Sequence, residues 1–127
     1  MVNNKAWKTS NTYMSYKSHF IPPVEGVIKL NFDGASKGNL GEAGLGGLFR
    51  DSQANTRLIY AERCGIANNN EAEFAAVRQG LLISIRLGYR NLEVEGDSSL
   101  VINTVTKLNN GTKWDKFNQR WRIAILI

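Results

Sequence analysis

Cysteine and histidine are nearly absent from this sequence, and their scarcity excludes several kinds of site. Cys64 is the only cysteine among 127 residues, which excludes an internal disulfide and a cysteine-based zinc cluster. The lack of disulfides is typical of reducing compartments, so we expect an intracellular location in the nucleus or cytoplasm, with organelle targeting left open. His19 is the only histidine, and its place in a polar N-terminal stretch indicates an exposed residue rather than a catalytic one.

Long apolar runs and nucleotide-binding glycine motifs are also missing. No apolar run approaches the length of a membrane-spanning helix, which predicts that the chain has no membrane partner. The glycine-rich residues 38–50 contain neither GxxxxGK[ST] nor GxGxxG, the patterns of phosphate-binding and dinucleotide-binding loops. We interpret these glycines as turn and close-packing positions.

Acidic residues are missing from the start of the chain. None precedes Glu25, and the first 25 residues are rich in Asn, Lys, Ser, Thr and Tyr. We interpret residues 1–25 as a flexible basic tail, stiffened at its end by Pro22 and Pro23, and residues 26–127 as one domain. The formal net charge of +5 modestly favours a polyanionic partner such as nucleic acid, because the charge is spread along the chain.

One short segment carries the clearest alternation in the sequence. Apolar Ile28, Leu30 and Phe32 alternate with polar residues, a period of two that predicts a strand with one buried face. Asp33 follows on the polar face, where its carboxylate could hold a cation. Alternatively, Asp33 and Gly34 begin a turn, since Asp-Gly is a common turn pair. Gly34 permits either a turn or the close approach of a ligand, because it has no Cβ.

The following segments predict an α/β domain. Residues 43–50 and 57–64 are expected to form two more strands of an antiparallel meander, because only short polar links join them. A helix is expected between the asparagines at 68–70, which favour the N-cap, and Gly88, a typical C-cap. The apolar residues that we assign to the core face of this helix are Phe74, Val77, Leu81 and Ile85.

A strand over 92–97 and a helix over 100–108 come next, before a last amphipathic helix expected over 112–125. A strand, helix, strand succession implies a right-handed crossover and parallel pairing. We therefore expect the strand that ends at Asp97 to lie beside the strand that ends at Asp33.

Three carboxylates should converge in this arrangement: Asp33, Glu73 and Asp97. Glu73 lies at the margin of the apolar stripe of its helix and can point along the seam between helix and sheet, whereas Glu71 is better interpreted as a surface residue that complements the helix dipole. Neighbouring carboxylates repel one another unless a cation lies between them. Oxygen ligands of this kind suit Mg²⁺ or Mn²⁺, and such ions support phosphodiester cleavage.

Three segments stand out in chain order: Asn31-Phe32-Asp33-Gly34-Ala35-Ser36-Lys37-Gly38-Asn39, Asn69-Asn70-Glu71-Ala72-Glu73 and Val94-Glu95-Gly96-Asp97-Ser98. Together they resemble the motifs of a type 1 ribonuclease H domain, most closely its plant and retroelement-derived group, over residues 27 to about 108. The resemblance implies an α/β, ribonuclease H-like mixed sheet of strand order 3-2-1-4, normally continued by a fifth strand and a closing helix. It also implies metal-dependent hydrolysis of the RNA strand of an RNA–DNA hybrid.

The same resemblance assigns roles to individual residues. Asp33, Glu73 and Asp97 match the carboxylates that are both catalytic and ligands of Mg²⁺ or Mn²⁺. Three asparagines match positions that contact the minor groove of the hybrid and its 2′-hydroxyls, which distinguish RNA from DNA, and a serine matches a position near a bound phosphate. The substrate-binding residues implied in this way are Gly34, Asn39, Asn69, Asn70 and Ser98.

The end of the sequence departs from the family pattern. The family has a fourth carboxylate in its closing helix and a histidine in the loop before it, whereas this chain ends thirty residues after Asp97 (127 − 97). We therefore expect the fifth strand and closing helix to be missing, and the apolar helix predicted over 112–125 to promote self-association. Two functions stay open: a ribonuclease H impaired by truncation, and a non-catalytic module that binds nucleic acid.

Overall fold

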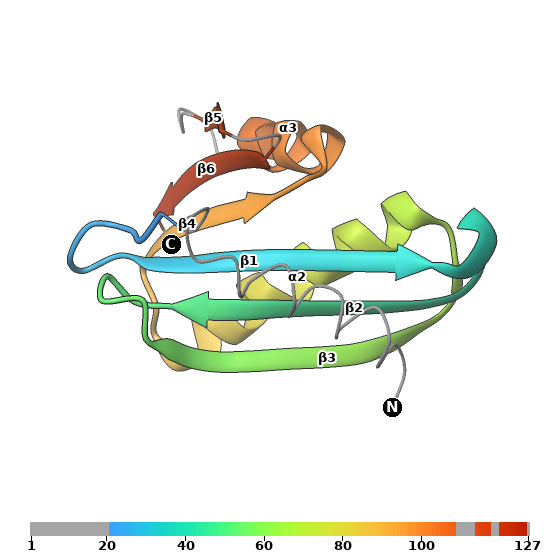
Figure 1. Ribbon diagram of the computed structural model, residues 1–127, viewed down its shortest axis with the longest axis horizontal. Coiled ribbons are helices and arrows are strands. Elements are labelled where there is room, and N and C mark those ends of the chain that lie inside the picture. Colours follow the sequence, from blue (N-terminus) through green and yellow to red (C-terminus); the bar gives the residue numbers. More distant parts are fainter. Residues whose placement is uncertain (1–20, 109–113, 118–119, 127) are drawn as a thin grey trace.

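A single mixed sheet organises the described part of the chain. The computed structural model describes residues 21–108, 114–117 and 120–126, so most of the predicted tail (residues 1–20) lies outside the described residues. The strand order is β3-β2-β1-β4-β6-β5, with α2 behind the first three strands in the view of Figure 1. The elements are β1 (Ile28–Ser36), the short 3-10 helix η2 (Lys37–Asn39), β2 (Gly41–Arg50), β3 (Thr56–Ala67), α2 (Asn69–Leu87), β4 (Asn91–Gly96), α3 (Ser99–Leu108), β5 (Trp114–Phe117) and β6 (Arg120–Leu126).

The central strand β1 has an antiparallel neighbour on one edge and a parallel neighbour on the other. It pairs with β2 along its whole length after Ile28, whereas its parallel pairing with β4 runs only from Ile28↔Leu92 to Asn31↔Glu95. This confirms the predicted parallel crossover and the order 3-2-1-4. β1 continues through Asp33 and Gly34 to Ser36, so the alternative in which Asp-Gly begins a turn is wrong.

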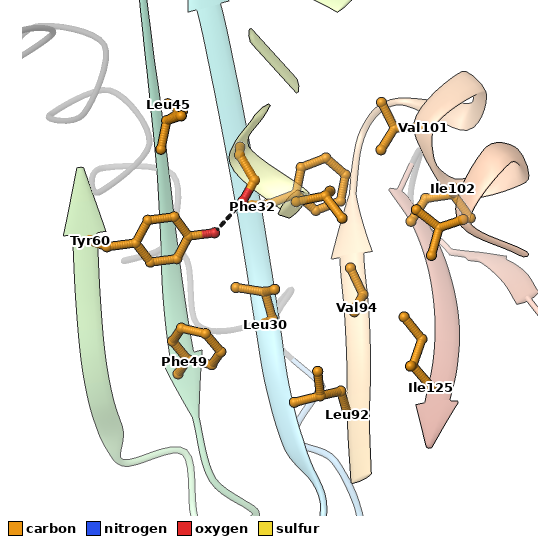
Figure 2. Close-up of a cluster of buried hydrophobic side chains, with 13 residues drawn as sticks. Leu30, Phe32, Leu45, Phe49, Tyr60, Leu92, Val94, Val101, Ile102 and Ile125 are labelled. Carbon is orange, nitrogen blue, oxygen red and sulfur yellow. Dashed lines mark hydrogen bonds between the residues drawn. The ribbon is translucent and has the colours of Figure 1, made fainter. Parts of the chain in front are cut away.

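The core lies between the sheet and the two helices, as Figure 2 shows for its central side chains. Leu30 and Phe32 of β1 are buried there together with Val94 of β4, which follows from the alternation read in the sequence. The hydroxyl of Tyr60 donates a hydrogen bond of 2.6 Å to the carbonyl oxygen of Ala76, the dashed line in Figure 2. This contact ties β3 to α2. Further core residues are Leu45, Phe49, Val77, Leu92, Val101, Ile102, Val105 and Ile125.

Helix α2 begins and ends as its sequence predicts, and its predicted core stripe is confirmed except at Ile85. Asn68 caps the helix in a reciprocal capping box with Glu71, and Gly88 ends it in the left-handed conformation. Val77 is buried, and Phe74 and Leu81 are partly buried against the core. The other buried residues of α2 are small, including Ala76 and Gly80. Ile85, which we assigned to the core stripe, is 59% exposed, because close contact between α2 and the sheet selects small side chains instead of large ones.

The predicted last helix over 112–125 is wrong, and so is the expectation that the strand position beyond β4 is empty. β6 pairs antiparallel with β4, and β5 pairs with β6. The sequence from Arg120 to Ile125 alternates polar or small residues with large apolar ones, which is typical of a strand. The positions of its apolar residues are also compatible with one face of a helix. The free edge of β4 decides between them, because it offers backbone partners to a strand. Self-association through a C-terminal helix therefore loses its basis.

The sheet face that looks away from α2 and α3 carries a buried lysine. Lys29 is fully buried, and its Nζ donates a hydrogen bond of 2.7 Å to Oε1 of Glu95 and lies 3.4 Å from Oε2 of Glu93. It also donates to the carbonyl oxygen of Ile21. One ammonium group thus joins β1, β4 and the segment before β1.

No helix in the described residues is long and apolar enough to cross a membrane.

Candidate active site

Three acids from three elements meet where β4 ends; we call Asp33, Glu73 and Asp97 the acidic cluster. The β1–β4 ladder ends at Asn31↔Glu95, two residues before Asp33 and Asp97 on their respective segments. Glu73 comes from α2, one turn after the helix begins. Its carboxyl shares a hydrogen bond with Asp97 and interacts electrostatically with Asp33. The structure therefore brings together the three carboxylates selected from the sequence.

Glu73 has an unusual protonation equilibrium. Burial, followed by the negative charges of Asp97 and Asp33, raises the pKa of Glu73 from 4.5 to about 8. At neutral pH its carboxyl therefore keeps its proton and donates the hydrogen bond to Asp97. A hydrogen bond from the backbone N–H of Gly34 to Oε1 of Glu73, 3.2 Å long, acts in the opposite direction, because it favours the charged carboxylate.

Gly34 makes the contact between β1 and α2 possible. A Cβ at this position would lie 2.3 Å from the carbonyl carbon and oxygen of Ala72 and 2.6 Å from the backbone nitrogen of Glu73. These are backbone atoms and cannot rotate away. The sequence suggested either a turn or the close approach of a ligand at Gly34. The structure has no turn there, and the group that lies against Gly34 is the first turn of α2.

Asn39 and Asn69 form a short hydrogen-bonded relay. The backbone N–H of Asn69 donates to Oδ1 of Asn39 at 2.9 Å, and the backbone N–H of Ser36 donates to Oδ1 of Asn69 at 2.9 Å. Because a backbone N–H needs an acceptor, the oxygen of each amide must face inward, and each NH₂ group must face outward. Both asparagines are exposed. They therefore present hydrogen-bond donors to solvent in a fixed orientation.

The other two predicted polar contacts are held differently. Asn70 is exposed, and no hydrogen bond orients its side chain within the described residues. Ser98 accepts a hydrogen bond of 3.2 Å from the backbone N–H of Val101, so its hydroxyl caps the start of α3. Sequence reasoning missed Ser36, whose backbone N–H completes the relay and whose hydroxyl donates to the carbonyl oxygen of Ala67. Only its place in the first motif could have indicated it.

The donor chemistry of the acidic cluster suits a divalent cation. Three carboxylates whose charges oppose the ionisation of one another gain from a positive ion, and hard oxygen ligands are those of Mg²⁺ and Mn²⁺. Within residues 21–108, 114–117 and 120–126, however, no three acidic, histidine or cysteine side chains are already arranged to hold an ion.

Comparison with known sequences identifies related proteins. A family model described as reverse transcriptase-like matches residues 31–126. Ribonuclease HI of Halobacterium salinarum is 33% identical over 85 residues, which are 67% of this chain and 43% of that protein. A putative ribonuclease H protein of Arabidopsis thaliana is 31% identical over 83 residues, which are 65% of this chain and 13% of that protein. The chain thus spans less than half the length of either relative.

Solved structures agree with this relationship. The crystal structure of RNase H1 from Halobacterium salinarum has a TM-score of 0.61 at 30% identity, covering 72% of this chain and 66% of that one. LC11-RNase H1, solved in complex with an RNA/DNA hybrid, has a TM-score of 0.59 at 28% identity, covering 68% of this chain and 64% of that one.

Proposed function

The chain belongs to the reverse transcriptase-like family, in the branch that contains ribonucleases H, and from this premise we propose that it is a metal-dependent endonuclease that hydrolyses the RNA strand of RNA–DNA hybrids. The observation that carries the proposal is the meeting of Asp33, Glu73 and Asp97 at the end of β4. The structural relative in complex with an RNA/DNA hybrid supports the substrate class.

Each residue of the acidic cluster has a separate task in this proposal. A bound Mg²⁺ or Mn²⁺ would supply the polarisation of the scissile phosphate and of the attacking water. Asp33 would hold the ion from within β1, and Asp97 from the residue that follows the end of β4. Glu73 would join them after losing its proton, while the N–H of Gly34 keeps Oε1 in place.

The outward-facing NH₂ groups of Asn39 and Asn69 suit the hydrogen-bond acceptors of the hybrid, among them the 2′-hydroxyl oxygens and the acceptors of the minor groove. Asn70 would add an adaptable contact. Ser98 lies beside Asp97 and would approach a phosphate, with its hydroxyl held by the start of α3.

A second candidate function is binding of nucleic acid without cleavage. The absence, from the described residues, of a ready arrangement of three metal ligands favours this candidate. It needs the donor surface of Asn39 and Asn69 but not the acidic cluster, so the two candidates differ in what a change of Asp33 does.

The deciding experiment measures binding and cleavage of a labelled RNA–DNA hybrid in Mg²⁺ or Mn²⁺. We expect Asp33→Asn to slow cleavage about a hundredfold or more, by analogy with the loss of one preorganised stabilising group, and to keep hybrid binding. Glu42→Gln, which changes an exposed acid of β2, is the matched control and should cleave like the parent. Hybrid binding without cleavage in the parent would favour the second candidate, and equal cleavage by parent and Asp33→Asn would refute the assigned site.

A further inference from the structure

The edge of β1 that faces β4 loses its strand partner halfway along. β4 pairs with β1 only as far as Asn31, while β1 continues to Ser36. On a strand, the N–H groups of residues two apart point to the same edge. The N–H groups of Gly34 and Ser36 therefore share one edge, beyond the end of the ladder with β4.

Two side chains of α2 accept from these two N–H groups. The N–H of Ser36 donates to Oδ1 of Asn69 at 2.9 Å, and the N–H of Gly34 donates to Oε1 of Glu73 at 3.2 Å. Residues four apart on a helix share a face and differ by about 6 Å along its axis, while residues two apart on a strand differ by about 6.7 Å. The two spacings match, so α2 replaces β4 as the partner of this edge.

We propose that Asn69 is a positioning residue for Glu73: its side-chain oxygen is the second point of a two-point dock that holds the first turn of α2 on β1 and so fixes where the Glu73 carboxyl lies. Without the bond to Ser36, the turn would keep only the Gly34 bond to β1, because the N–H of Asn69 bonds Asn39 in η2, and it could pivot about Gly34. With both, its position along β1 and its tilt are set. The closeness of Gly34 to Ala72 makes the position of the turn sensitive to such a pivot.

This role differs from a contact with nucleic acid. A residue that only touches a hybrid affects hybrid binding, and its loss leaves the protein unchanged when no nucleic acid is present. A positioning residue affects Glu73 in the protein alone. The inference rests on the proposed function only in that Glu73 is taken as a working carboxylate, and its test can be made without metal or hybrid.

The test is amide hydrogen exchange at Gly34, measured by NMR in the protein without metal or nucleic acid. Asn69→Ala removes the acceptor of Ser36 but leaves the acceptor of Gly34 intact. We expect the protection of the Gly34 amide to fall about tenfold nevertheless, the scale of a local opening made easier by one lost hydrogen bond. Asn70→Ala is the matched control, because Asn70 neighbours Asn69 and is likewise exposed, and it should leave Gly34 protection unchanged.

Two further variants keep the inference testable. Asn69→Asp retains the inward-facing acceptor and loses the outward-facing donors, so it should restore Gly34 protection while weakening hybrid binding. Asn69→Gln displaces the acceptor by one methylene group and should lower protection; it decides the question if Asn69→Ala does not fold. Affinity for Mn²⁺ alone, measured by calorimetry, should be lower in Asn69→Ala and Asn69→Gln than in the parent and should be restored in Asn69→Asp. Asn70→Asp is the control for the added charge.

The outcomes separate this inference from the proposed function. Unchanged Gly34 protection in Asn69→Ala, or in Asn69→Gln if the former does not fold, would overturn the positioning role even if the chain cleaves hybrid. Gly34 protection that falls in Asn69→Ala and returns in Asn69→Asp would support the role even if the chain cleaves nothing. In that case the proposed function would fail alone.

Discussion

The protonation of Glu73 predicts how the stability of the fold depends on pH. Its pKa is raised from 4.5 to about 8 in the folded protein, so the folded state binds this proton more tightly than the unfolded state does. The contribution to stability is therefore complete below about pH 4.5, is lost as pH rises toward 8, and stays lost above that value. Glu73→Gln, which mimics the protonated carboxyl at every pH, should remove this dependence.

The size of the effect follows from linkage. Each pH unit within this window changes the free energy of unfolding by at most about 1.4 kcal/mol. Between about pH 5 and pH 7 the parent should therefore lose roughly 2 to 3 kcal/mol more than Glu73→Gln does. Against a typical stability of about 5 to 15 kcal/mol for a domain, such a difference is readily measured.

Urea denaturation followed by circular dichroism, repeated across this pH range, would measure the difference. Glu71→Gln is the control, because it changes an exposed glutamate of the same helix that belongs to the capping box, and a glutamine can serve there as well. It should keep the pH dependence of the parent. Parallel stability curves for the parent and Glu73→Gln would show that the acidic cluster does not hold a proton at neutral pH.

Two further changes test the contacts that support the site. Gly34→Ala places a Cβ 2.3 Å from backbone atoms of Ala72, so we expect it to lower the free energy of unfolding by about 1 to 3 kcal/mol or more and to weaken Mn²⁺ binding; calorimetry showing parent-like affinity would contradict this. Lys29→Met leaves the buried carboxylate of Glu95 without its cation, which should lower stability by about 3 to 5 kcal/mol. The double variant Lys29→Met with Glu95→Leu should recover much of that loss in urea denaturation, and no recovery would mean that the ion pair is not the cause.

The sequence predicted those features that depend on local pattern. The alternation of Ile28, Leu30 and Phe32 identified β1 and the face that packs on the helices, although the opposite face, with Lys29 and Asn31, is buried as well. The helix boundaries at Asn68 and Gly88 were equally predictable, since capping is a local interaction of a few neighbouring residues.

Features that depend on distant partners were not predictable in the same way. The segment 120–126 has apolar spacing that fits both a helix and a strand, and the free edge of β4 decides between them. The exposure of Ile85 reflects how closely α2 approaches the sheet, which the sequence of α2 alone does not state.

The candidate site also combines features that local motifs predict with features that depend on distant contacts. Asp33, Glu73 and Asp97 could be selected as residues because the three motifs mark them. The proton held by Glu73 and the orientation of Asn69 by Ser36 could not, since both arise from contacts between segments that are distant in the sequence, 24 residues apart for Glu73 and Asp97 (97 − 73) and 33 for Ser36 and Asn69.

The replacement of β4 by α2 on the edge of β1 also affects the order in which contacts can form. The hydrogen bond from Gly34 to Glu73 closes a separation of 39 residues, whereas bringing Asp33 beside Asp97 closes one of 64 (97 − 33). The extra loop-closure entropy is under about 1 kcal/mol, so it weighs little on stability. During synthesis, however, β1, β2, β3 and α2 are complete before β4 exists, and α2 then already covers the part of the β1 edge that β4 never reaches. Until β4 has been synthesised, only the segment Ile28–Asn31 of β1 has no neighbour along this edge. This shortens the stretch of β1 through which an incomplete chain could pair with another chain.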